Sequence, residues 1–231
     1  MIGIIVQLAI SWIISWFFAK RNLSVLGFRP TKQRLADLML FFLVTAAFCS
    51  GGFLMKMYFG QQQWLFNPNL SVNLILTGIW WNIKSVLFEE LIFRGVLLYI
   101  LIKNLGALKA IILSAITFGV YHWFSFEVIG NPIQMLITFI ITGTMGLVLA
   151  YGYSKTFSLY LPIGIHLGWN LTQIFIFSEG PIGNGLLISS EPGGFRTNSY
   201  FIFFSVTFLP MLGTPLTNYI LIRKHRQAHN R

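Results

Sequence analysis

Seven apolar stretches divide the chain, and short polar segments separate them. A helix needs about 20 apolar residues to cross the hydrocarbon core of a bilayer. The pattern therefore predicts an all-α, polytopic membrane helix bundle with about seven transmembrane helices, in a range of six to eight. The stretches cover residues 1–19, 36–59, 72–102, 107–126, 132–153, 158–177 and 200–222.

The third stretch is too long for one simple crossing. As a continuous helix, residues 72–102 would measure about 46 Å against a hydrocarbon core of roughly 30 Å. Part of it must lie in the membrane interface, or the helix must break. Trp80 and Trp81 are of the residue type that anchors helices at the interface. We therefore expect 72–80 to be interfacial and 82–102 to form the crossing.

Composition agrees with this pattern. Of 231 residues, 55% are hydrophobic and 10% are charged, whereas soluble domains carry about 25% charged residues. No extramembrane domain fits between the apolar stretches, so we expect one integral-membrane domain over residues 1–231. The single cysteine, Cys49, leaves no intrachain disulfide and no cysteine metal cluster.

The positive charge has a topological explanation. There are 16 Lys and Arg residues against 6 Asp and Glu, and in a soluble protein this excess would suggest nucleic-acid binding. Here the basic residues concentrate in alternate loops, so the positive-inside bias predicts a multi-pass cell-membrane protein with its N-terminus outside and its C-terminus cytoplasmic. We expect the lipid bilayer as a partner and no nucleic acid. The longest outer loop, 178–199, is rich in Gly and Pro and is predicted to be irregular and mobile.

Polar residues inside the apolar stretches are the unexpected feature. An ionisable group in a spanning helix costs about 2.5 to 3.5 kcal/mol on insertion scales. Counting about 1.5 Å per residue from the flanking basic residues puts the polar groups of three stretches at about 17 to 22 Å. That common depth predicts one convergent polar site. Its members are Glu89, Glu90, Arg94, His122, His166 and Asn170.

Helical spacing suggests separate roles for the two acids. Glu90 and Arg94 are four residues apart in the favourable order for an ion pair. Glu89 points about 100° away on the helix, so it has no partner nearby in the sequence. An unpaired carboxylate near two imidazoles suits a general base that activates water.

The stretch that carries His166 also shows a packing pattern. Gly164 and Gly168 form a small-xxx-small pair, which lets a neighbouring helix approach closely. Pro162 stands four residues before His166 and frees a backbone carbonyl. We therefore expect a kinked, closely packed helix that holds the imidazole.

These residues resemble the three signature motifs of the CPBP family of intramembrane proteases. That family includes eukaryotic CAAX prenyl endopeptidases and bacterial members linked to bacteriocin self-immunity and peptide maturation. The resemblance covers about residues 70–180, which we expect to be the catalytic core. The motifs, in order, are Glu89-Glu90-x-x-x-Arg94, Phe118-x-x-x-His122 and His166-x-x-x-Asn170.

The resemblance implies a role for each motif residue. Glu89 would activate the attacking water and His122 would help to hold it. His166 and Asn170 would stabilise the oxyanion, with Glu90 and Arg94 as support. Glu89, His122 and His166 could also form a zinc site, although HExxH is absent. The sequence favours metal-free water activation narrowly over Zn²⁺.

The expected activity is cleavage of a peptide or membrane-associated protein, in CAAX-type processing, peptide maturation or self-immunity. Two alternatives remain open. A proton- or ion-coupled small transporter could use Glu89, His122 and His166 as a relay. A non-catalytic immunity protein could bind a peptide and cut nothing.

Overall fold

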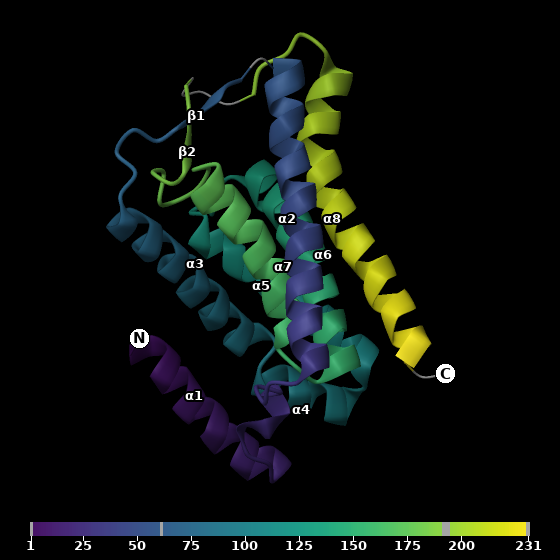
Figure 1. Cartoon of the computed structure of the whole chain (residues 1–231). Helices are drawn as coiled ribbons and strands as arrows, with labels where there is room; N and C mark the ends of the chain where they lie inside the picture. Colours follow the sequence, from purple (N-terminus) through teal and green to yellow (C-terminus); the bar gives the residue numbers. More distant parts are fainter. Residues whose placement is uncertain (1, 61, 191–194, 230–231) are drawn as a thin grey trace.

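The protein is a helical bundle, which confirms the predicted fold class (Figure 1). The computed structural model describes residues 2–60, 62–190 and 195–229, with side chains as far as 224. π-helical segments extend α1 (Ser15–Ala19) and α7 (Leu171–Ile176), and a 3-10 turn covers Leu23–Leu26. The helices are α1 (Ile2–Ile14), α2 (Lys32–Gly60), α3 (Val72–Phe93), α4 (Val96–Leu105), α5 (Ala107–Ser125), α6 (Pro132–Thr156), α7 (Tyr160–Asn170) and α8 (Tyr200–His229).

Five of the seven predicted crossings correspond to helices that are long and apolar enough to span a membrane. These are α1 with its π-helical extension, α2, α5, α6 and α8. The other two stretches form α3 with α4, and α7 with its extension. α7 with its extension is shorter than the five spanning helices, and α3 contains charged residues that lower its hydropathy. α7 lies in the centre, in contact with α2, α3 and α6.

The third stretch breaks within the segment 82–102, which was wrongly predicted to form one crossing. α3 is continuous from Val72 to Phe93 and includes the segment expected to be interfacial. The helix stops at Arg94 and Gly95, and α4 begins at Val96. At Gly95 a Cβ atom would lie 2.1 Å from the Leu91 carbonyl oxygen, so this sharp turn requires glycine. The break places Glu89 and Glu90 near the C-terminal end of α3.

Two glycines bring α7 against α2, as the small-xxx-small pattern predicts. A Cβ on Gly164 would lie 2.6 Å from the Leu38 carbonyl oxygen, and one on Gly168 would lie 2.5 Å from the Phe42 carbonyl oxygen. These contacts are with backbone, which cannot move aside as a flexible side chain can. The absence of two methyl groups therefore sets the distance between α2 and α7, and α7 carries His166.

We expect Gly168→Ala to destabilise the protein because the new methyl group would force α7 away from α2. Overpacking of this kind costs about 1 to 3 kcal/mol, measurable as reduced thermal stability in detergent. Gly51→Ala is the matched control, because Gly51 lies in α2, the helix that Gly168 contacts, and a Cβ there meets nothing within 4 Å. Helix propensity predicts unchanged or slightly higher stability for that control. Equal stability of the two variants would contradict a packing role for Gly168.

Pro162 does not kink α7, in contrast to the sequence-based expectation. The helix begins at Tyr160, so Pro162 lies in its first turn, where backbone N–H groups have no intrahelical acceptor in any case. The irregular part of this stretch is instead the π-helical segment Leu171–Ile176, which follows Asn170 directly.

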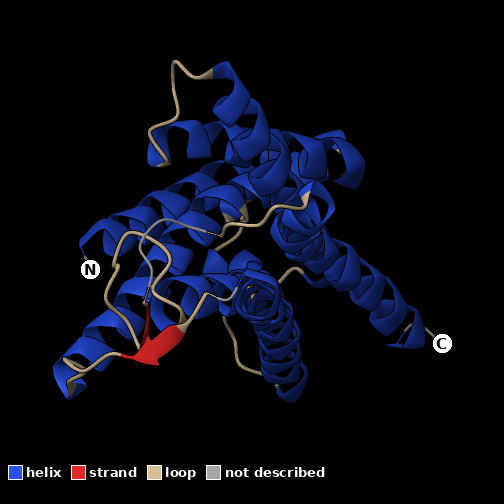
Figure 2. Ribbon diagram, turned by 90° about the horizontal axis from the view of Figure 1, so that it is seen from above, coloured by secondary structure: helices blue, strands red, loops and turns tan. Residues whose placement is uncertain are grey.

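Part of the loop 178–199 has regular structure, in contrast to the predicted irregular loop, and residues 191–194 lie outside the described residues. Its residues Leu187–Ser189 form β2, which pairs antiparallel with β1 (Trp64–Phe66). The pair lies at the end of the bundle opposite α4 (Figures 1 and 2). The side chain of Trp64 is buried there and donates a hydrogen bond to the Phe177 carbonyl oxygen (3.2 Å). Pairing with a distant segment, which local composition does not reveal, orders this part of the loop.

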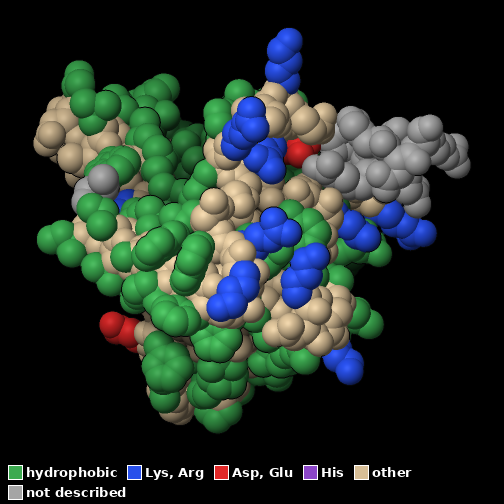
Figure 3. Space-filling model, turned by 90° about the horizontal axis from the view of Figure 1, so that it is seen from below, with side chains coloured by type: hydrophobic (Ala, Val, Ile, Leu, Met, Phe, Trp, Pro, Cys, Tyr) green, Lys and Arg blue, Asp and Glu red, His purple; other side chains and the backbone are tan. Residues whose placement is uncertain are grey.

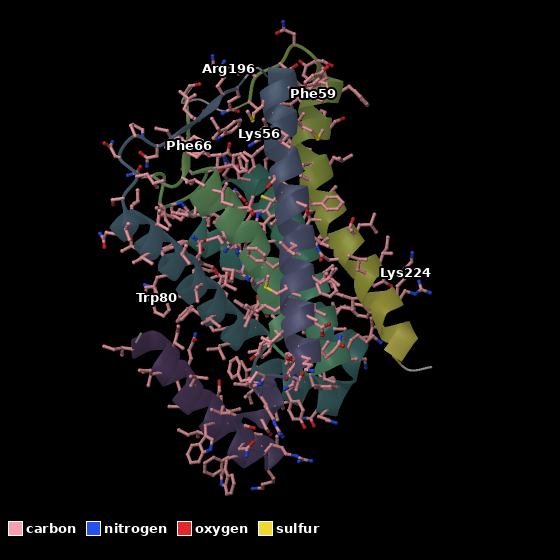
Figure 4. The ribbon with its side chains drawn as sticks, in the orientation of Figure 1. Lys56, Phe59, Phe66, Trp80, Arg196 and Lys224 are labelled. Carbon is pink, nitrogen blue, oxygen red and sulfur yellow. The ribbon has the colours of Figure 1, made fainter. Side chains whose placement is uncertain are left out.

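Basic side chains gather at one end of the molecule. Figure 3 shows Lys and Arg side chains spread over the lower face, where α1 ends and α4 lies (Figure 1). Figure 4 places Lys224 toward that end and Lys56 and Arg196 at the opposite one. The predicted orientation depends on an unequal distribution of basic residues between the two ends of the bundle, and the structure has such a distribution.

Candidate functional site

Three helices bring the predicted ionisable residues together. Glu89 comes from α3, His122 from α5 and His166 from α7. The Glu89 Oε2 atom lies 3.9 Å from His122 Nε2 and 3.8 Å from His166 Nε2. All three side chains are almost fully buried. The convergence expected from their common depth is therefore present, even though α3 and α4 do not form one continuous helix.

Hydrogen bonds at the opposite ring atoms fix both imidazoles. His122 Nδ1 lies 2.8 Å from the Phe118 carbonyl oxygen, and His166 Nδ1 lies 2.7 Å from Glu90 Oε1. Because these oxygens accept, each Nδ1 donates. In a neutral imidazole the other nitrogen then carries a lone pair. Both Nε2 atoms therefore face the Glu89 carboxylate as acceptors.

Glu90 has two partners rather than the one that spacing predicted. Its Oε1 accepts from Arg94 Nη1 at 3.1 Å, which confirms the predicted ion pair, and also from His166 Nδ1. Both Glu90 and Arg94 are fully buried. The Arg94 guanidinium also lies 4.0 Å from the centre of the Phe118 ring, a cation–π contact. Arg94 thus supports a carboxylate that in turn orients an imidazole.

The two imidazoles border a cavity of about 190 Å³, to which Asn170 also contributes. Glu89 belongs to the same convergent site but is not part of the cavity wall. The carboxylate instead contacts the Nε2 edges of the imidazoles that form the wall. The remaining wall is mostly apolar and is made by Phe118, Phe126, Thr138, Ile141, Thr142, Met145, Trp169, Gln173 and Met211.

A second cavity, of about 270 Å³, adjoins the first. Both are bordered by Trp169, Gln173 and Met211. The second cavity lies between α2 and α8, and its wall includes an ion pair between Lys56 and Glu179 (2.8 Å). Together the two cavities lead from the imidazoles toward the end of the bundle that carries the strand pair.

The same three side chains are the candidates for holding a metal. Two imidazole nitrogens with free lone pairs and a carboxylate suit zinc chemically. In a tetrahedral site with ligands at about 2.1 Å, neighbouring ligand atoms stand about 3.4 Å apart, whereas the Oε2 to Nε2 distances here are 3.8 and 3.9 Å. Among the described residues, no group of three His, Cys, Asp or Glu stands in metal-binding geometry. The side chains would have to draw together to bind Zn²⁺.

Two contributors to the site were not predicted from the sequence. Phe118 stands in the second motif but was given no role there, yet its carbonyl fixes His122 and its ring contacts Arg94. Phe118 stands four residues before His122, which is one helical turn away. This spacing could have indicated the contact between the Phe118 carbonyl and His122. Met211 comes from α8, outside residues 70–180. An isolated methionine in an apolar helix gives no such signal.

The fold and the site define a class of protein. The helical membrane bundle holds a carboxylate close to two oriented imidazoles, beside a cavity. Residues 68–172 match the family described as type II CAAX prenyl endopeptidase Rce1-like. This similarity to the CAAX protease (CPBP) family, over the part of the chain that carries the three motifs, supports an intramembrane endopeptidase in general terms. Comparisons with curated proteins and with solved structures give no match.

Proposed function

We propose that the protein hydrolyses a peptide bond with a water molecule that Glu89 activates. The observation that carries this proposal is the position of Glu89 Oε2, which is buried, has no hydrogen-bond partner among the described residues and faces two imidazole nitrogens. A buried acceptor of this kind is costly unless something satisfies it. A water molecule can do so by donating one hydrogen to Glu89 and the other to His122 Nε2.

The proton balance of the reaction follows from this arrangement. Glu89 takes a proton from the water as the oxygen attacks the carbonyl carbon of the substrate. The protonated Glu89 then gives this proton to the leaving amine as the carbon–nitrogen bond breaks. One carboxylate thus acts first as general base and then as general acid.

The oxyanion of the tetrahedral intermediate needs hydrogen-bond donors. Asn170 can donate from its side-chain amide at the cavity wall. His166 has no hydrogen on Nε2 while it is neutral, so donation from this atom requires the imidazolium form. The Glu90 carboxylate, 2.7 Å from Nδ1, balances the charge of that form. We therefore assign Glu90 and Arg94 to the positioning of His166.

The substrate class follows from the surroundings of the site. The two joined cavities are mainly apolar and lie inside the helix bundle, which suits a hydrophobic peptide segment or part of a membrane protein. We place the chemistry within residues 70–180 and propose a multi-pass cell-membrane protein with its N-terminus outside. CAAX-type processing and the maturation of, or immunity to, a secreted peptide are the roles consistent with such a substrate.

Incubation of detergent-purified protein with a library of hydrophobic peptides, followed by mass spectrometry, tests the proposed activity. We expect discrete cleavage products. A chelator arm tests the role of metal in the same assay, and we expect cleavage to persist because Glu89 and His122 can hold the water without a metal. Loss of cleavage with chelator, restored by Zn²⁺, would instead favour a metal held by Glu89, His122 and His166. Proton flux in liposomes without peptide cleavage would indicate a transporter.

A further inference from the structure

A groove that is separate from the catalytic cavity lies between α5, α6 and α8. Its volume is about 560 Å³, within the range of about 300 to 1,000 Å³ that is typical of small-molecule sites. None of its lining residues borders the catalytic cavity. Most of them are apolar, and they comprise Ala107, Leu108, Ile111, Thr144, Leu147, Val148, Tyr151, Ser154, Lys155, Leu212, Pro215, Leu216 and Tyr219.

The groove has the length of one lipid chain in one leaflet. Along α6 it extends from Thr144 to Lys155, which at about 1.5 Å per residue is about 16 Å. One leaflet accounts for half of the hydrocarbon core, or about 15 Å. Leu147 and Leu216 are exposed along this length, which suits contact with an acyl chain. A single acyl chain therefore fits the groove from end to end.

One end of the groove is polar and basic. Lys155 Nζ lies 5.3 Å from the centre of the Tyr151 ring, and the rings of Tyr151 and Tyr219 are 5.1 Å apart. Arg223, one turn after Tyr219 on α8, is close enough to Tyr151 to interact electrostatically. No acid in the described part of the chain forms an ion pair with Lys155 or Arg223. Lys155 and the two tyrosines thus line the polar end of an apolar channel, and Arg223 lies close to this end.

We propose that this groove binds an anionic glycerophospholipid from the leaflet at the basic end of the bundle. One acyl chain occupies the apolar length, and Lys155 and Arg223 bind the phosphate with the tyrosine hydroxyls nearby. Basic pockets between transmembrane helices are suited to anionic headgroups in this way. The proposal is independent of the peptidase activity, since the groove and the catalytic cavity have no wall residue in common.

Native mass spectrometry of delipidated, detergent-purified full-length protein tests the proposal by titration with two lipids. Dioleoyl-phosphatidylglycerol and dioleoyl-phosphatidylcholine have the same chains and differ in headgroup charge. We expect the wild type to bind the anionic lipid roughly 25-fold more tightly, because two cations contribute about fivefold each. Lys155→Gln and Arg223→Gln should each weaken binding of the anionic lipid about fivefold, because one surface cation contributes about 1 kcal/mol. Binding of the zwitterionic lipid should be almost unchanged.

Two further variants separate the groove from general surface charge. Leu147 is exposed along the channel, and the larger side chain of Leu147→Trp would fill the channel. We therefore expect both lipids to bind more weakly to this variant. Lys224→Gln removes a cation one residue from Arg223, and this side chain lies on the side of α8 away from the bundle (Figure 4). We expect no effect from this change.

Four results would overturn the proposal. The first is equal affinity for the two lipids, and the second is an effect of Lys224→Gln as large as that of Lys155→Gln. The third is unchanged lipid binding by Leu147→Trp. The fourth is that the groove binds a neutral isoprenoid alcohol and that phosphatidylglycerol does not displace this alcohol. The last result would assign the groove to an uncharged lipid chain.

Discussion

Glu89→Gln should abolish measurable peptide cleavage while the protein folds and accumulates normally. The amide has nearly the volume of the carboxylate and still accepts a hydrogen bond, so the contacts around the imidazoles persist. It cannot take a proton from water. General-base catalysis contributes about 10² to 10⁴-fold to rate, and we expect a loss of turnover of this size. The measurement compares kcat for one cleaved peptide between purified wild type and variant.

The control for this experiment is Glu127→Gln, which changes an exposed acid in the turn after α5 and should leave kcat unchanged. Peptide binding by Glu89→Gln, measured separately, should survive because the cavity wall does not include Glu89. Equal cleavage by wild type and Glu89→Gln would refute the mechanism. Persistence of an immunity phenotype in cells that carry Glu89→Gln would indicate a protein that binds peptide without cutting it.

The sequence could predict that the site residues meet, because polar residues are rare and costly inside membrane-spanning helices. In a chain that is 55% hydrophobic, each buried charge needs a partner or a function. Glu89, His122 and His166 lie at similar depths on separate helices, which was enough to predict that they meet. Spacing within one helix likewise predicted the Glu90–Arg94 pair and the close approach of a neighbouring helix at Gly164 and Gly168.

The link between Glu90 and His166 could not be predicted in the same way. It joins residues 76 positions apart and depends on how α3 and α7 are rotated about their axes. The position of the helix break illustrates the same limit. Length showed that residues 72–102 could not form one straight crossing, but the break at Gly95 depends on the close approach to the Leu91 carbonyl. The pairing of β1 with β2 is also a long-range contact without a local signal.

Arg94→Ala should sharply reduce the amount of protein in membranes. The guanidinium is fully buried and donates to Glu90 Oε1 at 3.1 Å, so its removal leaves a buried carboxylate with only the His166 hydrogen bond. Breaking a buried ion pair from one side costs about 3 to 5 kcal/mol, a large part of the stability of a typical domain. The measurement is protein yield in membranes together with thermal stability in detergent.

Two companion variants test whether this loss comes from the stranded charge. Arg21→Ala removes an exposed arginine and should accumulate normally. The double variant Glu90→Gln with Arg94→Met removes both charges and keeps an amide oxygen that accepts from His166 Nδ1, so we expect it to recover much of the lost accumulation. Its turnover should stay below that of the wild type, because a neutral amide does not balance the imidazolium form of His166. Normal accumulation of Arg94→Ala with activity lost would instead give Arg94 a direct part in the reaction.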